Sequence, residues 1–317
     1  MTNTYFEILR SGTNTTIQDN GRNHLYHIGI TTSGAVDKRN YKISNALVKN
    51  DLNEAVIEFA YQGPLLKLRN GSINFAITGD IFFNIIRNNL EVEEGNCYQN
   101  YVLNDGEEID IISSKKSVYG YLSVNGGFLI KKMWDSYSVN TKAEIGPNDG
   151  KKYSINDKIE IKISEAKKIQ NKKIKYINNP NNLIRVIKGT NFDYFSDEAK
   201  KIFFKEEFSV TSLTDRMGMR LEGPKLINNI KTNIKSEGLI KGVIQVPGDC
   251  KPIILLSDHG TIGGYPKIAV VISADLDKVA QLTPGTKVRF KEVSLKEAEE
   301  FFREYIKETT EYLNECN

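Results

Sequence analysis

The sequence predicts a mainly β fold, a sandwich or a barrel rather than a doubly wound parallel sheet. Three stretches alternate apolar and polar residues, as half-buried strands do: residues 73–77, 109–111 and 159–163. Turn signals separate such stretches, at Asn70-Gly71, at residues 104–106 and at Pro284-Gly285. Few long segments carry a helical period, so we expect only a few short helices and one at the C-terminus.

The clearest predicted helix begins at Ser294. The Ser294 hydroxyl can cap the free amides of the first turn while the Glu297 side chain reaches back. One face of this helix is apolar and is expected to cover a barrel or sheet; it consists of Leu295, Ala298, Phe301, Phe302, Tyr305 and Ile306. Shorter covering helices are predicted at residues 38–48 and 196–204, the second with Ser196 as its cap.

A change in composition divides the chain. The stretch at residues 166–182 is rich in Lys and Asn, contains an Asn-Pro step and shows little apolar periodicity, as exposed linkers do. We therefore expect one β-domain at residues 1–165 and a second at residues 183–317, which ends in the helix. A Gly-Pro step beside apolar strand residues occurs in both halves, at Gly63 and at Gly223, and two related barrels would explain this similarity.

Composition limits the classes of function. The chain has 317 residues, 39% of them hydrophobic, enough for a substantial core and two domains of ordinary size. Lys and Arg number 43 against 40 Asp and Glu, so no strong field of one sign would recruit nucleic acid or an anionic membrane. A small molecule or another protein is the expected partner.

The chain shows no signal for export or for a disulfide framework. Residues 1–12 lack the apolar region of a signal peptide, and no run of about 18 apolar residues occurs, so we expect a cytoplasmic protein. The three cysteines, Cys97, Cys250 and Cys316, have no Cys-x-x-Cys spacing, which favours free thiols over disulfides or a zinc site.

Four segments combine glycines with polar side chains that can converge on a ligand. The first segment offers groups for proton transfer and carboxylate recognition, namely Gln18, Asp19, Arg22, His27, Ser33 and Asp37. The same pattern fits a polar loop in which Asp and Ser only complete turns. The second segment places Asn125 and Gly126 before hydroxyl residues at 134–138, and there a structural turn is the favoured interpretation.

The third segment, residues 212–224, is rich in charge. Its Asp215, Arg216, Arg220 and Glu222 can form an internal ion-pair network or position an anionic substrate, and the planar guanidinium suits both tasks equally.

The fourth segment is the longest. Two apolar strands, residues 253–256 and 268–272, flank a glycine-rich turn that carries Asp258, His259, Tyr265 and Lys267, and Gln245 precedes them. This is where a β-scaffold presents a site. The turn lacks the spacing and the strand-to-helix context of a P-loop. Three histidines without His-x-x-x-His spacing give little support to a catalytic metal, so none is predicted.

Taken in order, these segments resemble a known family. The matching residues are Gln18, Asp19, Gly21 and Arg22; His27 and Gly29; Ser33, Gly34, Ala35 and Asp37; Asn45, Leu47 and Val48; Glu58, Gly63 and Pro64; Asp215, Arg216, Met217, Gly218, Arg220, Leu221 and Gly223; Glu237 and Gly238; Gly242 and residues 244–247; residues 263–267; and residues 274–276. Together they resemble the biotin-dependent carboxyltransferase-like family. Its members include the C subunit of 5-oxoprolinase, also called allophanate hydrolase subunit 2, the antagonist of a sporulation-kinase inhibitor, and the carboxyltransferase region of urea carboxylase.

The resemblance implies two cyclophilin-like β-barrel domains with a site in the cleft between them. It also implies a hydrolase component that opens 5-oxoproline to glutamate together with an A and a B subunit, the latter similar to the sporulation-kinase inhibitor. The complex would use ATP, with Mg, to phosphorylate the lactam carbonyl before hydrolysis. Biotin is not expected on this chain, because no Met-Lys-Met site occurs in it.

By analogy with that chemistry, the candidate residues take three roles. Asp37, Asp258 and His27 are expected to transfer or orient protons. Anion recognition falls to Arg22 and to Arg216 or Lys267. The hydrogen-bonding residues are expected to be Gln18, Ser33, Gln245 and Tyr265.

The sequence departs from the family at several positions. Asp135-Ser136-Tyr137-Ser138 stands where the family usually has Gly-Ser-Arg-Ser, so a phenol replaces a cationic group. Gly260 and Ile262 replace a longer polar residue and a Thr. Two other functions therefore stay open: a regulatory protein that sequesters a partner like the sporulation-kinase inhibitor, or a carboxyltransferase component related to urea carboxylase.

Overall fold

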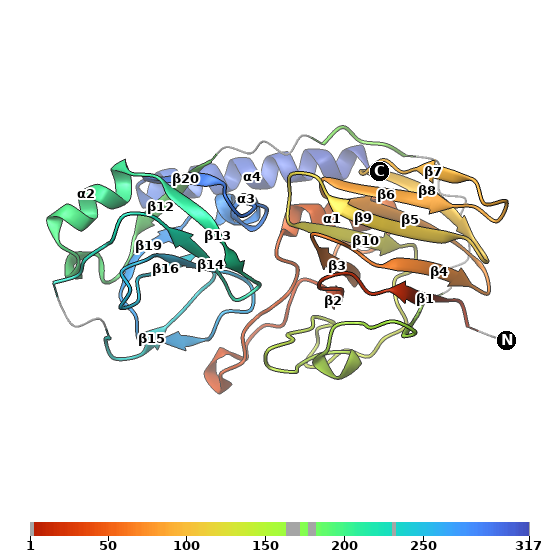
Figure 1. Ribbon diagram of the computed structural model, residues 1–317, viewed down its shortest axis with the longest axis horizontal. Coiled ribbons are helices and arrows are strands. Elements are labelled where there is room, and N and C mark those ends of the chain that lie inside the picture. The colour runs from red at the N-terminus through yellow and green to blue at the C-terminus, as the bar shows by residue number, and fades with distance from the viewer. Residues whose placement is uncertain (1–2, 163–171, 177–181, 230–232, 317) are drawn as a thin grey trace. The chain divides into compact units, whose positions relative to one another are not determined.

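The computed structural model describes residues 3–162, 172–176, 182–229 and 233–316. The chain divides into two compact units, which Figure 1 draws as ribbons. The first unit comprises Met1–Arg22, Ser33–Ile177 and Thr309–Asn317, and the second comprises Asn23–Thr32 and Asn178–Glu308. Within the predicted linker, residues 166–171 and 177–181 lie outside the described residues, so the boundary at 166–182 stays a prediction.

The predicted mainly β fold is confirmed. The first unit holds a six-stranded sheet of order β11-β1-β4-β9-β6-β7 and a five-stranded sheet of order β2-β3-β10-β5-β8. Its elements are β1 Tyr5–Arg10, β2 Thr16–Gln18, α1 Lys38–Leu47, β3 Val56–Ala60, β4 Leu65–Arg69, β5 Ser72–Thr78, β6 Ile81–Ile86, β7 Val92–Glu94, β8 Gln99–Asn104, β9 Glu108–Ser114, β10 Tyr119–Val124, the 3-10 helix η2 Asn148–Gly150 and β11 Lys158–Glu160.

The second unit is built on a closed barrel of order β12-β19-β16-β17-β14-β13-β20, in which only the pair β12 and β20 runs parallel. A two-stranded sheet, β15 with β18, accompanies the barrel. The elements are η1 Tyr26–Ile28, β12 Leu183–Lys188, η3 Phe192–Tyr194, α2 Asp197–Lys205, β13 Phe208–Thr214, β14 Gly218–Glu222, β15 Glu237–Gly238, β16 Val243–Gln245, β17 Ile253–Leu255, β18 Ile262–Gly263, β19 Lys267–Val271, η4 Ser273–Asp275, α3 Leu276–Ala280 and β20 Lys287–Glu292. Helix α4 Leu295–Glu315 contributes residues to both units.

The alternating stretches form the predicted strands. Residues 73–77 lie within β5 and residues 109–111 within β9, with Phe75, Ile77, Ile109 and Ile111 fully buried in the core of the first unit. The third stretch begins in β11, while its last residue, Ile163, lies outside the described residues. In the second unit, the predicted strands 253–256 and 268–272 become β17 and β19.

The predicted helix caps are confirmed. The Ser196 hydroxyl accepts a hydrogen bond from the Ala199 amide at 3.1 Å, and α2 starts at the next residue. At α4 the Ser294 amide donates to the Glu297 carboxylate at 2.7 Å, and the Glu297 amide donates to the Ser294 hydroxyl at 3.2 Å. This reciprocal box satisfies two amides that the first turn leaves without helical partners.

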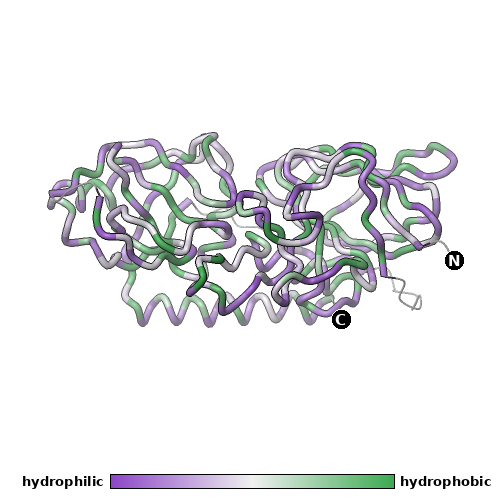
Figure 2. The backbone as a smooth tube through the Cα atoms, turned by 90° about the horizontal axis from the view of Figure 1, so that it is seen from below, coloured by the Kyte–Doolittle hydropathy of each residue, from purple (hydrophilic) through white to green (hydrophobic). Residues whose placement is uncertain are grey.

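The predicted apolar face of α4 is covered only in part. Leu295, Phe302 and Ile306 are 65%, 41% and 45% exposed. Two residues of this face make contacts with polar or charged groups: the Arg185 guanidinium lies 3.9 Å from the Phe301 ring centre, and the Tyr305 hydroxyl donates to the Asp277 carboxylate at 2.5 Å. Figure 2 shows the resulting alternation of hydrophilic and hydrophobic residues along the helix.

The barrel core is aromatic where α2 covers it. The rings of Phe203, from α2, and Phe290, from β20, stack at 4.4 Å with an angle of 13° between their planes. Both side chains are almost fully buried. Aromatic pairs of this kind stabilise a core beyond the area they bury. This packing stabilises the barrel from which the loops of the second unit extend.

Candidate functional site

A pocket of about 670 Å³ lies in the second unit, at strands β13, β14, β16 and β17 and the loop that follows β17. Two of the residues predicted to bind substrate, Gln245 and Tyr265, line it, and Asp215, Arg220 and His259 line it with them. Its volume suits a small molecule. This pocket is therefore our candidate site.

Gln245 and Tyr265 leave polar atoms available to a ligand. The Gln245 side-chain amide donates to the Tyr265 carbonyl oxygen at 3.3 Å, which fixes the amide and leaves its own oxygen as an acceptor. Tyr265 is 41% exposed, and its hydroxyl makes no hydrogen bond within the described residues. Both side chains can thus bind a polar ligand.

Arg220 provides positive charge at this pocket. It lies on β14 opposite Ile253 of β17, and its side chain is exposed. Over the part of the chain that the structure describes, the guanidinium makes no ion pair. A planar guanidinium of this kind can bind a carboxylate through two hydrogen bonds.

His259 also lines the pocket, although it is only 2% exposed. Its Nδ1 lies 2.6 Å from the Gly260 carbonyl oxygen, and its Nε2 lies 3.2 Å from the Tyr26 hydroxyl. Burial lowers the pKa of this histidine below its ordinary value. The ring is therefore neutral near pH 7, as a proton acceptor must be.

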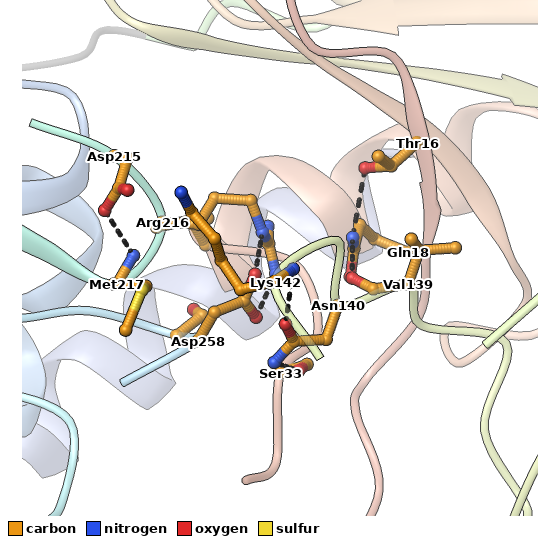
Figure 3. Close-up of polar contacts among 12 residues, drawn as sticks. Thr16, Gln18, Ser33, Val139, Asn140, Lys142, Asp215, Arg216, Met217 and Asp258 are labelled. Carbon is orange, nitrogen blue, oxygen red and sulfur yellow. Dashed lines mark hydrogen bonds and ion pairs between the residues drawn. The ribbon is translucent and has the colours of Figure 1, made fainter. Parts of the chain in front are cut away.

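Asp258 is held by Arg216. The Arg216 Nε donates to one Asp258 oxygen at 2.7 Å and its Nη2 to the other at 3.0 Å, and both side chains are buried. Figure 3 shows this paired contact beside Asp215, which accepts from the Met217 amide. Because both carboxylate oxygens already accept from the guanidinium, the geometry favours a positioning role over proton transfer.

Lys267 is likewise engaged. Its ammonium donates to the Glu237 carboxylate and, at 3.3 Å, to the Asn191 side-chain oxygen, and the residue is 4% exposed. The ammonium holds the pKa of the Glu237 carboxyl below its ordinary value. Lys267 therefore joins β15 to the residue before η3, and it is not among the residues that line the pocket.

His27, predicted to transfer protons, belongs to the second unit and is exposed on η1. Its side chain makes no hydrogen bond or ion pair within the described residues. The neighbouring Tyr26, which we did not predict, makes the contact with His259 instead. A tyrosine in a polar loop carries no sequence signal that would have identified this role.

The other predicted site residues, Gln18, Arg22, Ser33 and Asp37, belong to the first unit. The Gln18 amide donates to the Thr16 hydroxyl at 3.0 Å and to the Val139 carbonyl at 2.8 Å, as Figure 3 shows. The Ser33 hydroxyl accepts from the Asn140 amide at 3.3 Å. These contacts attach Gln18 and Ser33 to the segment around residue 139.

Asp37 caps helix α1. One of its carboxylate oxygens accepts from the Asn40 amide at 3.0 Å and the other from the Asn40 side chain at 2.6 Å, and the residue is 2% exposed. An N-terminal cap of this kind is a common structural use of aspartate. The geometry therefore supplies a complete structural explanation for Asp37.

Asp19 organises the segment in which the sequence departs from the family that it resembles. Its carboxylate accepts from the hydroxyls of Ser136 at 2.7 Å and Ser138 at 2.5 Å, from the Tyr137 amide at 2.7 Å and from the Gly21 amide at 2.8 Å. Arg22 donates to the Ser138 carbonyl. The two serines thus bind a buried carboxylate, a role that sequence patterns did not reveal.

Tyr137 stands where the family usually has arginine, and cations surround its ring. The ammonium groups of Lys132 and Lys162 lie 5.0 and 5.5 Å from the ring centre. Such contacts stabilise an aromatic ring modestly at an exposed position. Positive charge therefore remains beside residue 137, although the guanidinium is absent.

Neither a metal site nor a membrane-spanning helix is found in the part of the chain that the structure describes. No three His, Cys, Asp or Glu side chains gather there as metal ligands would. The three cysteines are free. Among those same residues, no helix combines the length and the apolar character needed to cross a bilayer.

Comparison with known proteins identifies similar chains. Residues 28–292 match the family model described as carboxyltransferase domain, subdomain A and B. The chain is 31% identical to the C subunit of 5-oxoprolinase from Haemophilus influenzae, over 98% of this chain and 99% of that protein. It is 30% identical to the C subunit of 5-oxoprolinase from Escherichia coli, over 92% of each chain.

Among solved structures, the urea amidolyase of K. lactis has a similar fold. The TM-score is 0.88 at 24% identity, over 98% of this chain and 20% of that chain. At this level of identity the likeness concerns the fold alone.

Proposed function

Because this chain belongs to the family of the carboxyltransferase domain, subdomains A and B, we propose that it is the C subunit of an ATP-dependent 5-oxoprolinase. It would act in the cytoplasm with the A subunit of that enzyme and with a B subunit like the sporulation-kinase inhibitor, and open 5-oxoproline to glutamate through a phosphorylated lactam. The match to the C subunit of 5-oxoprolinase over nearly the full length of both chains is the observation that supports this most.

The pocket of the second unit supports a small substrate with a carboxylate. In our proposal Arg220 binds the carboxylate of 5-oxoproline, and Gln245 and Tyr265 bind its amide. His259, buried and neutral, accepts a proton. Asp258 and Arg216 support the loop that carries His259, and Lys267 holds β15 through Glu237.

The residues of this pocket do not fit ATP with its magnesium ion. A triphosphate needs several cations or a loop of free backbone amides. Arg220 is the cationic side chain that lines the pocket, while Arg216 and Lys267 already bind carboxylates. We therefore assign ATP to another component of the complex.

Our proposal for the first unit is less specific. Gln18, Arg22, Ser33 and Asp37 stay candidate residues of the same reaction, since they occupy the positions that the family resemblance assigns. Their contacts in the structure are structural ones within the first unit: Gln18 and Ser33 bind the segment around residue 139, and Asp37 caps α1.

The variant Arg220→Gln tests the pocket assignment. Loss of a charged, two-bond contact to the substrate carboxylate is expected to raise KM for 5-oxoproline by about tenfold to a hundredfold. The measurement is steady-state turnover of the complex reconstituted with the A and B subunits. Arg289→Gln, on the barrel strand β20 and away from the pocket, is the matched control and should leave KM unchanged. An unchanged KM in Arg220→Gln would exclude this pocket as the carboxylate site.

A regulatory function is the second candidate. In this function the chain would sequester a partner like the sporulation-kinase inhibitor and would convert no substrate. The carboxyltransferase function is third: this chain covers only 20% of the K. lactis urea amidolyase, so the remaining parts would have to come from other chains.

A further inference from the structure

A short segment of the N-terminal half reaches the candidate pocket. Residues Asn23–Thr32 belong to the second unit, although the residues on either side of them belong to the first. Two contacts join this segment to the loop after β17: the Tyr26 hydroxyl lies 3.2 Å from His259 Nε2, and the Thr31 hydroxyl donates to the Ser257 carbonyl at 3.5 Å. The shorter of these contacts ends on the histidine that lines the pocket.

The contacts of His259 determine where its proton lies. A carbonyl oxygen can only accept, so the 2.6 Å contact between Nδ1 and the Gly260 oxygen requires the proton on Nδ1. In the neutral ring, Nε2 then carries a lone pair, and the Tyr26 hydroxyl must donate to it. The two contacts together select one tautomer and one orientation of the ring.

We propose that Tyr26 is a positioning residue for His259: its hydroxyl donates to Nε2 and so holds the buried imidazole in the neutral Nδ1–H form. This inference rests on the proposed function in one respect only, namely that His259 accepts a proton in the 5-oxoprolinase reaction. The ring contact itself is independent of the substrate: the Tyr26 and His259 ring centres lie 6.2 Å apart at an angle of 54°.

The charges around His259 are compatible with this role. The Asp258 carboxylate favours the protonated ring, and the Lys241 ammonium disfavours it, while burial disfavours it more than either. Arg216 binds Asp258 through both oxygens and so weakens the pull of that carboxylate on the ring. A hydroxyl that donates to Nε2 adds to burial, since it stabilises the neutral form.

The test is a measurement of the histidine ring nitrogens by NMR in the free chain of 317 residues. Only three histidines exist, and His24 and His27 are exposed, so His259 can be assigned by difference with His259→Gln. In the wild-type chain we expect His259 as the Nδ1–H tautomer, with a pKa below the ordinary value of histidine. In Tyr26→Phe the pKa of His259 is expected to rise toward that ordinary value.

The reconstituted complex supplies the second measurement. Tyr26→Phe is expected to lower kcat about tenfold, the loss typical of one neutral hydrogen bond, with KM nearly unchanged. Tyr194→Phe is the matched control, because Tyr194 also lies in a 3-10 helix of the second unit and its hydroxyl makes no hydrogen bond within the described residues. The double variant Tyr26→Phe with His259→Gln should have the same kcat as His259→Gln alone, because Tyr26 acts only through His259.

Two results would overturn the inference: an Nε2–H tautomer of His259 in the wild-type chain, or a pKa of His259 that Tyr26→Phe leaves unchanged. Both concern the free chain. An absence of 5-oxoprolinase activity in the wild-type complex, with the tautomer and pKa as expected, would contradict the proposed function and leave the positioning role standing.

Discussion

Replacing Asp258 with asparagine is expected to destabilise the second unit by about 3 to 5 kcal/mol. The change removes one charge of a buried pair in which Arg216 contacts both carboxylate oxygens, at 2.7 and 3.0 Å. The guanidinium would keep its burial and lose its counter-charge, and an asparagine offers one acceptor oxygen where the carboxylate offers two. The measurement is the free energy of unfolding in urea.

Asp193→Asn is the matched control for this prediction, because Asp193 is an exposed residue of the same unit and should change stability by no more than about 0.5 kcal/mol. If Asp258→Asn unfolded at the same urea concentration as the wild-type chain, the ion pair of Arg216 with Asp258 would not stabilise the loop that carries His259. If it also retained full activity, Asp258 would have no essential part in the reaction.

Asp19→Ala should destabilise the first unit by about 3 kcal/mol. Its carboxylate accepts four hydrogen bonds, from two serine hydroxyls and two backbone amides, and a buried donor that loses its acceptor costs about 1 to 3 kcal/mol. The hydroxyls can rotate to other acceptors, whereas the Tyr137 amide is fixed by the backbone. Thermal unfolding measures the effect.

The control for Asp19→Ala is Asp51→Ala, since Asp51 lies exposed in the same unit. Equal melting temperatures for the two variants would contradict the role given to Asp19. A large decrease in melting temperature in Asp19→Ala alone would support a structural role for Ser136 and Ser138, which bind the Asp19 carboxylate. Such a role explains serines at these two positions although residue 137 departs from the family.

The strands and helix caps could be predicted because their causes are local. Period-2 alternation places every second residue of β5 in the core, and the capping box of α4 needs only residues 294–297. The exposed side of α4 could not be predicted, since the same apolar pattern fits a covered and an uncovered face. Whether such a face is covered depends on elements distant in the sequence.

The roles of the polar site residues were harder to predict for the same reason. Gln245 and Tyr265 line the pocket, and their binding of substrate stays a prediction. Lys267 and Arg216 look like anion-binding groups in the sequence, yet their carboxylate partners, Glu237 and Asp258, lie 30 and 42 residues away. Tyr26 gave no signal at all, because its importance arises only when segment 23–32 joins the second unit.

The most direct test of the central proposal is ATP-dependent conversion of 5-oxoproline to glutamate by this chain mixed with the A and B subunits that neighbouring genes encode. Each of the three chains is omitted in turn. We expect activity only when all three are present, and restoration of activity when this chain is added back. Activity unchanged by its omission, with a stable complex still formed by the three chains, would contradict the enzymatic function and favour the regulatory one.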